Sequence, residues 1–183
     1  MIILASGSPR RAKLLKDAGI EFKIVTSDIE ETFNPDLEPQ EVAMYLARLK
    51  AKHIALSYKD DIVIGADTIV VYNNQILGKP IDQEDAFRML SMLSNQCHFV
   101  YTGVSIIKGE DEDTFYDQTE VCMKPLSELE IKSYIRTLEP MDKAGSYGIQ
   151  GEGRHLVEKY EGDFFTIMGL PLKKVINQLK KHI

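Results

Sequence analysis

Residues 2–11 read Ile2-Ile3-Leu4-Ala5-Ser6-Gly7-Ser8-Pro9-Arg10-Arg11. A short apolar run of β type stops at small hydroxyl residues. Pro9 then fits the first position of a helix, where its missing N–H is no loss. Ser8 is a natural N-cap for that helix, because its hydroxyl can accept a backbone N–H that has no partner. The stretch therefore predicts a strand that runs directly into a helix.

Two guanidinium groups, those of Arg10 and Arg11, fall on the first turn of this helix. The helix dipole favours anions at that end and disfavours cations. Together with backbone N–H groups and the hydroxyls of Ser6 and Ser8, the two arginines would suit a polyphosphate. On these residues alone, a capped surface helix with two solvated arginines explains the pattern equally well.

The composition favours one ordinary domain. The chain has 183 residues, of which 44% are hydrophobic, enough for a sizeable core. A net charge of −6 argues against an extended basic surface for nucleic acid, and no apolar run is long enough to span a bilayer. Cys97 and Cys122 match no disulfide framework or metal spacing, so we expect reduced thiols in a cytoplasmic protein.

Helical and strand-like patterns alternate along the whole chain. Helices are expected over residues 9–18, 39–57, 82–93 and 127–137, and from about residue 170. Strands are expected over 2–5, 22–25, 62–72, 75–77, 99–107 and 114–123, with an acidic turn at 110–113 and a last hairpin around 161–163. This order predicts one α/β domain over residues 1–183, with a mixed, strongly twisted sheet flanked by helices.

Asp67 stands out because it lies in the middle of the strand-like run 62–72, which is otherwise apolar or small. An unpaired buried carboxylate costs several kcal/mol, roughly, so a cation, a metal or a water to be activated must stabilise it. Gly65 and Ala66 remove bulk beside it, as expected where a ligand approaches the backbone. A carboxylate at a strand bend that bonds to backbone amides is the alternative.

Glu30 and Glu31 lie in a polar loop just beyond a strand end, where ligand sites of α/β proteins are common. One of them could join Asp67 around a divalent cation such as Mg²⁺ or Mn²⁺, which takes carboxylate and water oxygens. Lys50 and Lys79 could reach phosphates. Acidic loop pairs and single lysines are more often simply solvated.

Several established motifs are missing from the sequence. No G-x-x-x-x-G-K-[ST] loop, dinucleotide fingerprint or G-x-S-x-G elbow is present, and the four histidines are isolated. The sequence thus excludes P-loop, Rossmann and α/β-hydrolase chemistry by their usual signatures.

Taken in order, six segments resemble the Maf family of nucleoside triphosphate pyrophosphatases. They are Leu4-Ala5-Ser6-Gly7-Ser8-Pro9-Arg10-Arg11, Ile64-Gly65-Ala66-Asp67-Thr68, Gly78-Lys79-Pro80, Glu139-Pro140-Met141-Asp142-Lys143-Ala144-Gly145, Tyr147-Gly148-Ile149-Gln150-Gly151 and Met168-Gly169-Leu170-Pro171. The resemblance implies a two-lobed α/β fold related to the inosine triphosphate pyrophosphatases. It also implies a cytoplasmic, often dimeric enzyme that hydrolyses a nucleoside triphosphate to the monophosphate and pyrophosphate with a divalent metal.

Carried over by position, Asp67 would be the proton acceptor that activates water. Three positions would be tied to substrate choice: Arg11, Thr68 and Gln150. Five more residues would line the same site: Ser6, Arg10, Glu31, Lys50 and Lys79. Glu31 and Asp67 could hold the metal, which would keep the pKa of Asp67 low. Whether Asp67 is base, ligand or both stays open at this level.

The segment 142–151 resembles the subgroup that acts on dTTP and UTP. The Gln150 amide offers a donor and an acceptor, which suits the imide edge of thymine or uracil. A nucleotide-pool housecleaning role follows from that resemblance. The alternatives are a pyrophosphatase for 7-methyl-GTP or modified purines, and a non-catalytic nucleotide-binding regulator of septum formation.

Overall fold

The chain begins with a β–α–β unit, as the sequence predicts. A computed structural model describes residues 1–183. β1 (Ile2–Leu4) leads into α1 (Pro9–Asp17) and then β2 (Lys23–Ile24). β1 pairs in parallel with β2 on one side and with β3 (Ile62–Tyr72) on the other. The loop after β1 therefore leaves the sheet from a strand that has a neighbour on each side.

One sheet holds all seven strands, in the order β2-β1-β3-β5-β6-β7 with β4 paired to β3. The remaining strands are β4 (Gln75–Leu77), β5 (Cys97–Lys108), β6 (Asp111–Met123) and β7 (Val157–Glu161). β4 and β7 pair antiparallel with β3 and β6, whereas β1 pairs in parallel, so the sheet is mixed. The predicted α/β class with a mixed sheet is confirmed.

The chain divides into two compact units. Unit 1 contains residues 1–68, 102–117 and 169–183, and unit 2 contains residues 69–101 and 118–168. Besides α1, unit 1 contains α2 (Pro39–Ala55) and α6 (Leu172–Leu179). Unit 2 contains α3 (Gln83–Leu93), α4 (Glu128–Arg136) and α5 (Phe164–Met168), with the 3₁₀ turns η1 (Glu139–Asp142), η2 (Ala144–Ser146) and η3 (Gly151–Leu156). None of the helices combines the length and the apolar content that a membrane span requires.

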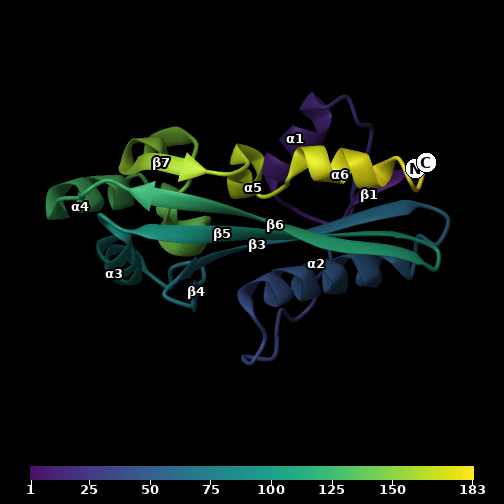
Figure 1. Cartoon of the computed structure of the whole chain (residues 1–183), viewed down its shortest axis with the longest axis horizontal. Helices are drawn as coiled ribbons and strands as arrows, with labels where there is room; N and C mark the ends of the chain where they lie inside the picture. Colours follow the sequence, from purple (N-terminus) through teal and green to yellow (C-terminus); the bar gives the residue numbers. More distant parts are fainter. The chain divides into compact units, whose positions relative to one another are not determined.

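α2 lies along the sheet (Figure 1). It packs closely at two glycines, Gly65 in β3 and Gly103 in β5. A Cβ at Gly65 would collide with the Ala47 carbonyl oxygen, and one at Gly103 with that of Ala43. Ala43, Ala47 and Ala51 recur every four residues and are fully buried, so one face of α2 carries only small side chains. The expectation that Gly65 makes room for a ligand was wrong, because the space is taken by a helix.

Three further sequence expectations need correction. The acidic residues 110–113 do not form one solvated turn, because β6 begins at Asp111 and Glu112 pairs with Arg48 and Lys52 of α2. The hairpin around 161–163 does not form, since α5 follows Gly162. In both places the sequence predicts a turn or hairpin where the structure has a strand or a helix, β6 in the first case and α5 in the second.

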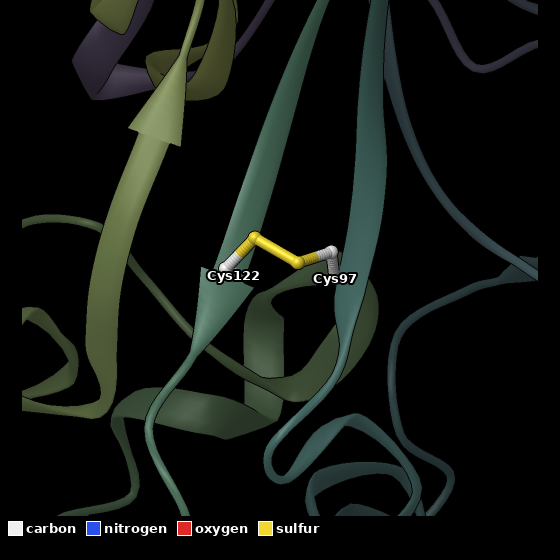
Figure 2. The surroundings of a disulfide bond; sticks show 2 residues. All are labelled: Cys97 and Cys122. Atoms are coloured by element: carbon white, nitrogen blue, oxygen red, sulfur yellow. A yellow bond between two sulfur atoms is a disulfide. The ribbon is translucent and has the colours of Figure 1, made fainter.

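The third correction concerns Cys97 and Cys122, which form a disulfide with Cα atoms 4.0 Å apart. Figure 2 shows the two side chains pointing toward one another from neighbouring strands, β5 and β6. The Met123 N–H donates to the Gln96 carbonyl at 2.9 Å, so the strands pair right beside the cysteines. Glu120 lies close to both sulfurs, but sulfurs bonded to each other offer no thiolate to a metal.

We expect Gly65→Ala to lower the free energy of unfolding by about 1–3 kcal/mol, because an added Cβ forces α2 away from β3. Gly78→Ala is the matched control, since its Cβ would meet nothing within 4 Å. Urea unfolding of both variants under non-reducing conditions measures the difference. Equal stability of the two variants would contradict the close packing of α2.

A histidine is buried in unit 2, where His98 Nε2 lies 2.6 Å from the Tyr147 hydroxyl oxygen. Its Nδ1 atom is buried with no hydrogen-bond partner. Burial lowers the pKa of His98 from 6.5 to about 4, so the folded protein holds the ring neutral.

Between pH 6.5 and about 4 the unfolded chain therefore binds a proton at His98 that the folded chain does not. Stability must fall as the pH drops through this window, by roughly 3 kcal/mol from this group. We expect His98→Gln to flatten that part of the profile, which chemical unfolding at successive pH values would measure. An unchanged slope in the variant would assign the acid sensitivity to other groups.

Candidate functional site

The end of β1 and the start of α1 form the first part of the candidate site. Ser8 is the N-cap of α1 and its hydroxyl accepts the Arg11 N–H, with Pro9 in the first turn, as predicted. The Ser6 hydroxyl oxygen, nearly buried, accepts the Ser8 N–H at 3.2 Å. Arg10 lies half-buried on the same first turn. Backbone N–H groups and a cation thus meet at one helix start, where an anion is favoured.

Arg11 is not a solvated side chain, because its guanidinium donates to three oxygens of unit 1. Nε donates to the Gly169 carbonyl at 2.7 Å, Nη1 to Ser6 Oγ at 3.0 Å and Nη2 to Thr68 Oγ1 at 2.9 Å. Thr68 Oγ1 in turn lies 2.9 Å from Thr102 Oγ1. Arg11 therefore ties the helix start to β3, to β5 and to the turn before α6.

Gly169 is required at that turn for two reasons. Its φ of +108° lies in a region that side chains rarely adopt, and an added Cβ would lie 3.2 Å from Arg11 Nε. In the sequence, Gly169 stands out only as part of a motif, and Thr102 does not stand out at all. Neither residue type signals a site in the sequence, because each matters through its contact with a distant side chain.

Asp67 and Lys50 form the centre of the candidate site. Asp67 is only 7% exposed, and its Oδ1 accepts a hydrogen bond from Lys50 Nζ at 2.6 Å. Lys50 Nζ also lies 3.0 Å from Glu31 Oε1. Two carboxylates thus converge on one ammonium group. The group that stabilises the buried Asp67 carboxylate is therefore the ammonium group of Lys50, which belongs to α2.

The electrostatics of this cluster reflect its burial. Desolvation raises the pKa of the Asp67 carboxyl, while Lys50 and Arg11 act in the opposite direction and Glu31 adds to the rise. Desolvation also lowers the pKa of the Arg11 guanidinium, against the effect of Asp67. The low pKa expected for Asp67 assumed a bound metal. In the protein itself, burial makes this carboxylate a better proton acceptor.

Two predicted site residues, Lys79 and Gln150, belong to unit 2, where both are exposed. Lys79 follows β4 in a loop, and Gln150 precedes η3. Gln150 lines an open pocket of about 770 Å³ in unit 2 together with Arg154, Tyr160 and Phe164. The residues that unit 1 brings close together are Ser6, Ser8, Arg10, Arg11, Glu31, Lys50, Asp67 and Thr68.

An α/β fold with a cationic helix start beside a buried, ion-paired aspartate defines a protein that can bind a phosphorylated ligand and hold a general base next to it. Comparison with known proteins agrees with this class. A family model described as "Maf-like protein" matches residues 1–182. The chain is therefore a member of the Maf family.

Close relatives carry the name dTTP/UTP pyrophosphatase. One from Bacillus cereus (strain G9842) is 49% identical over 180 residues, which cover 98% of this chain and 94% of the relative. Another from Bacillus anthracis is 48% identical with the same coverage.

Two solved structures are more distant. The Staphylococcus aureus Ham1 protein is 17% identical, covers 67% of this chain and 71% of its own, and has a TM-score of 0.47. A nucleoside-triphosphatase / dITP/XTP pyrophosphatase from Mycobacterium abscessus is 14% identical, covers 98% and 94%, and has a TM-score of 0.45. At these scores neither likeness adds to the assignment.

We expect Lys50→Met to lower the free energy of unfolding by about 3 kcal/mol, because it leaves the Asp67 carboxylate buried without its partner. The double variant Lys50→Met with Asp67→Asn should regain part of that loss, since it removes the charge as well. Urea unfolding of the wild type, both single variants and the double variant completes the cycle. Strictly additive effects would show that the two side chains are not coupled.

Proposed function

We propose that the chain hydrolyses nucleoside triphosphates, dTTP and UTP by preference, to the monophosphate and pyrophosphate. The observation that carries this proposal is the buried Asp67, held by Lys50 beside the Arg11 network, in a chain 49% identical to dTTP/UTP pyrophosphatases. Removal of such nucleotides from the pool would be its role in the cell.

In this proposal Asp67 accepts the proton of the water that attacks the α-phosphorus, and pyrophosphate leaves. Its burial supports the role, because a carboxylate with a raised pKa is a stronger base. The hydrogen bond from Lys50 fixes the position of Oδ1. This bond leaves Oδ2 as the oxygen that would face the water.

The phosphate chain would contact the helix start of α1, where the hydroxyls of Ser6 and Ser8 and the charge of Arg10 gather. Lys50 and Lys79 would add positive charge as negative charge develops on the phosphoryl oxygens. Arg11 and Thr68 would influence substrate choice from a fixed position, since the hydrogen bond between them holds both side chains.

A divalent metal, Mg²⁺ or Mn²⁺, fits the donor set. Glu31 and Asp67 lie close together, each with only one carboxylate oxygen bonded to Lys50 Nζ, and carboxylates are the oxygen ligands that such ions prefer. These two residues would hold the ion. When bound, it would supply Lewis-acid stabilisation of the developing phosphoryl charge.

Gln150 would select the base, since its amide can donate to a carbonyl oxygen and accept from the N3–H of uracil or thymine. Its exposure on the wall of the unit 2 pocket is consistent with contact to a ligand. The family resemblance further supports a homodimer in the cytoplasm. The Cys97–Cys122 bridge weighs against that location, because disulfides are rare in the reducing cytosol.

We expect Asp67→Asn to lower the rate of pyrophosphate release from dTTP and UTP by about 10²–10⁴, the usual contribution of a general base. Asp17→Asn is the matched control, because Asp17 makes only an exposed pair with Lys13 in α1. Pyrophosphate and orthophosphate are measured separately for dTTP, UTP, 7-methyl-GTP and inosine triphosphate, with Mg²⁺, with Mn²⁺ and with chelator.

Orthophosphate as the first product would rule out the proposed reaction. Nucleotide binding without any phosphate release would favour the non-catalytic regulator. A preference for 7-methyl-GTP or inosine triphosphate would overturn the choice of substrate. Full activity in chelator would overturn the metal requirement.

A further inference from the structure

The segment that carries Gln150 is held on its C-terminal side by one carboxylate of the same unit, that of Glu139. Glu139 Oε2 accepts the Glu152 N–H at 3.0 Å, and Oε1 accepts the Gly153 N–H at 3.0 Å. Both bonds lie just after Gln150 in the chain. A charged acceptor gives hydrogen bonds about twice as strong as neutral ones, so these contacts fix the backbone firmly.

Tyr134 holds the same segment on the N-terminal side of Gln150. Its hydroxyl donates to Glu139 Oε1 at 2.9 Å and accepts the Gly148 N–H at 3.1 Å. Burial raises the pKa of Tyr134, so the hydroxyl keeps the proton that it donates. Residues 148–153 are therefore bonded to the Glu139–Tyr134 pair before and after Gln150.

The backbone also wraps closely around this carboxylate. A Cβ at Gly151, where φ is +71°, would lie 2.7 Å from Glu139 Oε2, and one at Gly148 would lie 2.7 Å from Lys143 Cε and 3.3 Å from Glu139 Oε1. Glycine at both positions lets the chain approach the charge. The arrangement leaves Gln150 itself exposed, on the wall of the pocket that includes Tyr160 and Phe164.

We propose that Glu139 is a positioning residue for base selection, which sets the place and direction of the Gln150 amide through residues 148–153. The inference rests on the proposed function, in which Gln150 contacts the base. A carboxylate that served folding alone would form the same bonds. The two roles differ in whether loosening the loop changes which base is accepted.

UTP and CTP make the sharpest pair of probes, because their bases differ only at position 4 and in the proton at N3. Glu139→Gln keeps the shape of the side chain but leaves one oxygen to accept, so one or more of the three donors loses its partner. We expect the UTP/CTP ratio of kcat/KM to fall about tenfold, through a higher KM for UTP, with kcat within about twofold of wild type.

Three further variants complete the design. Glu139→Gln combined with Gln150→Ala should show no lower ratio than Gln150→Ala alone, because both act through the same amide. Tyr134→Phe removes only the hydroxyl and should give a smaller fall in the ratio, which keeps the test open if Glu139→Gln folds poorly. Glu128→Gln, at an exposed residue of α4 that pairs with Lys132, is the control that should leave the ratio unchanged.

A wild-type ratio in Glu139→Gln, with only the melting temperature lowered, would overturn the proposal. So would a further fall in the double variant, since Glu139 would then act apart from Gln150. Binding of the α,β-imido analogues of UTP and CTP separates this inference from the reaction. If no pyrophosphate is released from any nucleotide, the proposed function fails, while loss of analogue selectivity in Glu139→Gln would still support the positioning role.

Discussion

The close approach of α2 to the sheet determines where the reactive groups of unit 1 lie. Gly65 and Gly103 carry no side chain, and Ala43, Ala47 and Ala51 present little more than backbone, so helix and strands touch. Lys50 extends from this helix to Asp67, two residues after Gly65. A bulkier contact would lift the helix and carry the ammonium group away from the carboxylate. The contact between Lys50 and Asp67 therefore depends on the absence of side chains at Gly65 and Gly103.

Two cationic side chains near Asp67, Arg11 and Lys50, make different kinds of contact. Arg11 uses its planar group to join three segments that are distant in sequence, so it sets the shape of the site. Lys50 acts as a point charge that contacts Glu31 and Asp67 together, so it holds the two carboxylates close to each other.

Much of the fold could be predicted because its signals are local. The cap at Ser8 and the long buried strand around Asp67 each follow from neighbouring residues. The contacts that complete the site are between distant segments. Nothing near Asp67 in sequence indicates Lys50 as its partner, and nothing near Arg11 indicates Gly169. The pairing of Cys97 with Cys122 also depends on how two strands meet, which the spacing of two cysteines does not reveal.

That pairing has a consequence for the chain when it is not folded. The bridge joins the start of β5 to the end of β6 across 25 residues, so it closes most of the hairpin into a covalent ring. An unfolded ring has fewer conformations than an open chain, which is worth about 3.5 kcal/mol on the loop-entropy model. The unfolded ensemble thus retains one long-range contact of the sheet. The disulfide thus reduces the number of conformations of the unfolded chain even where no hydrophobic residue is buried.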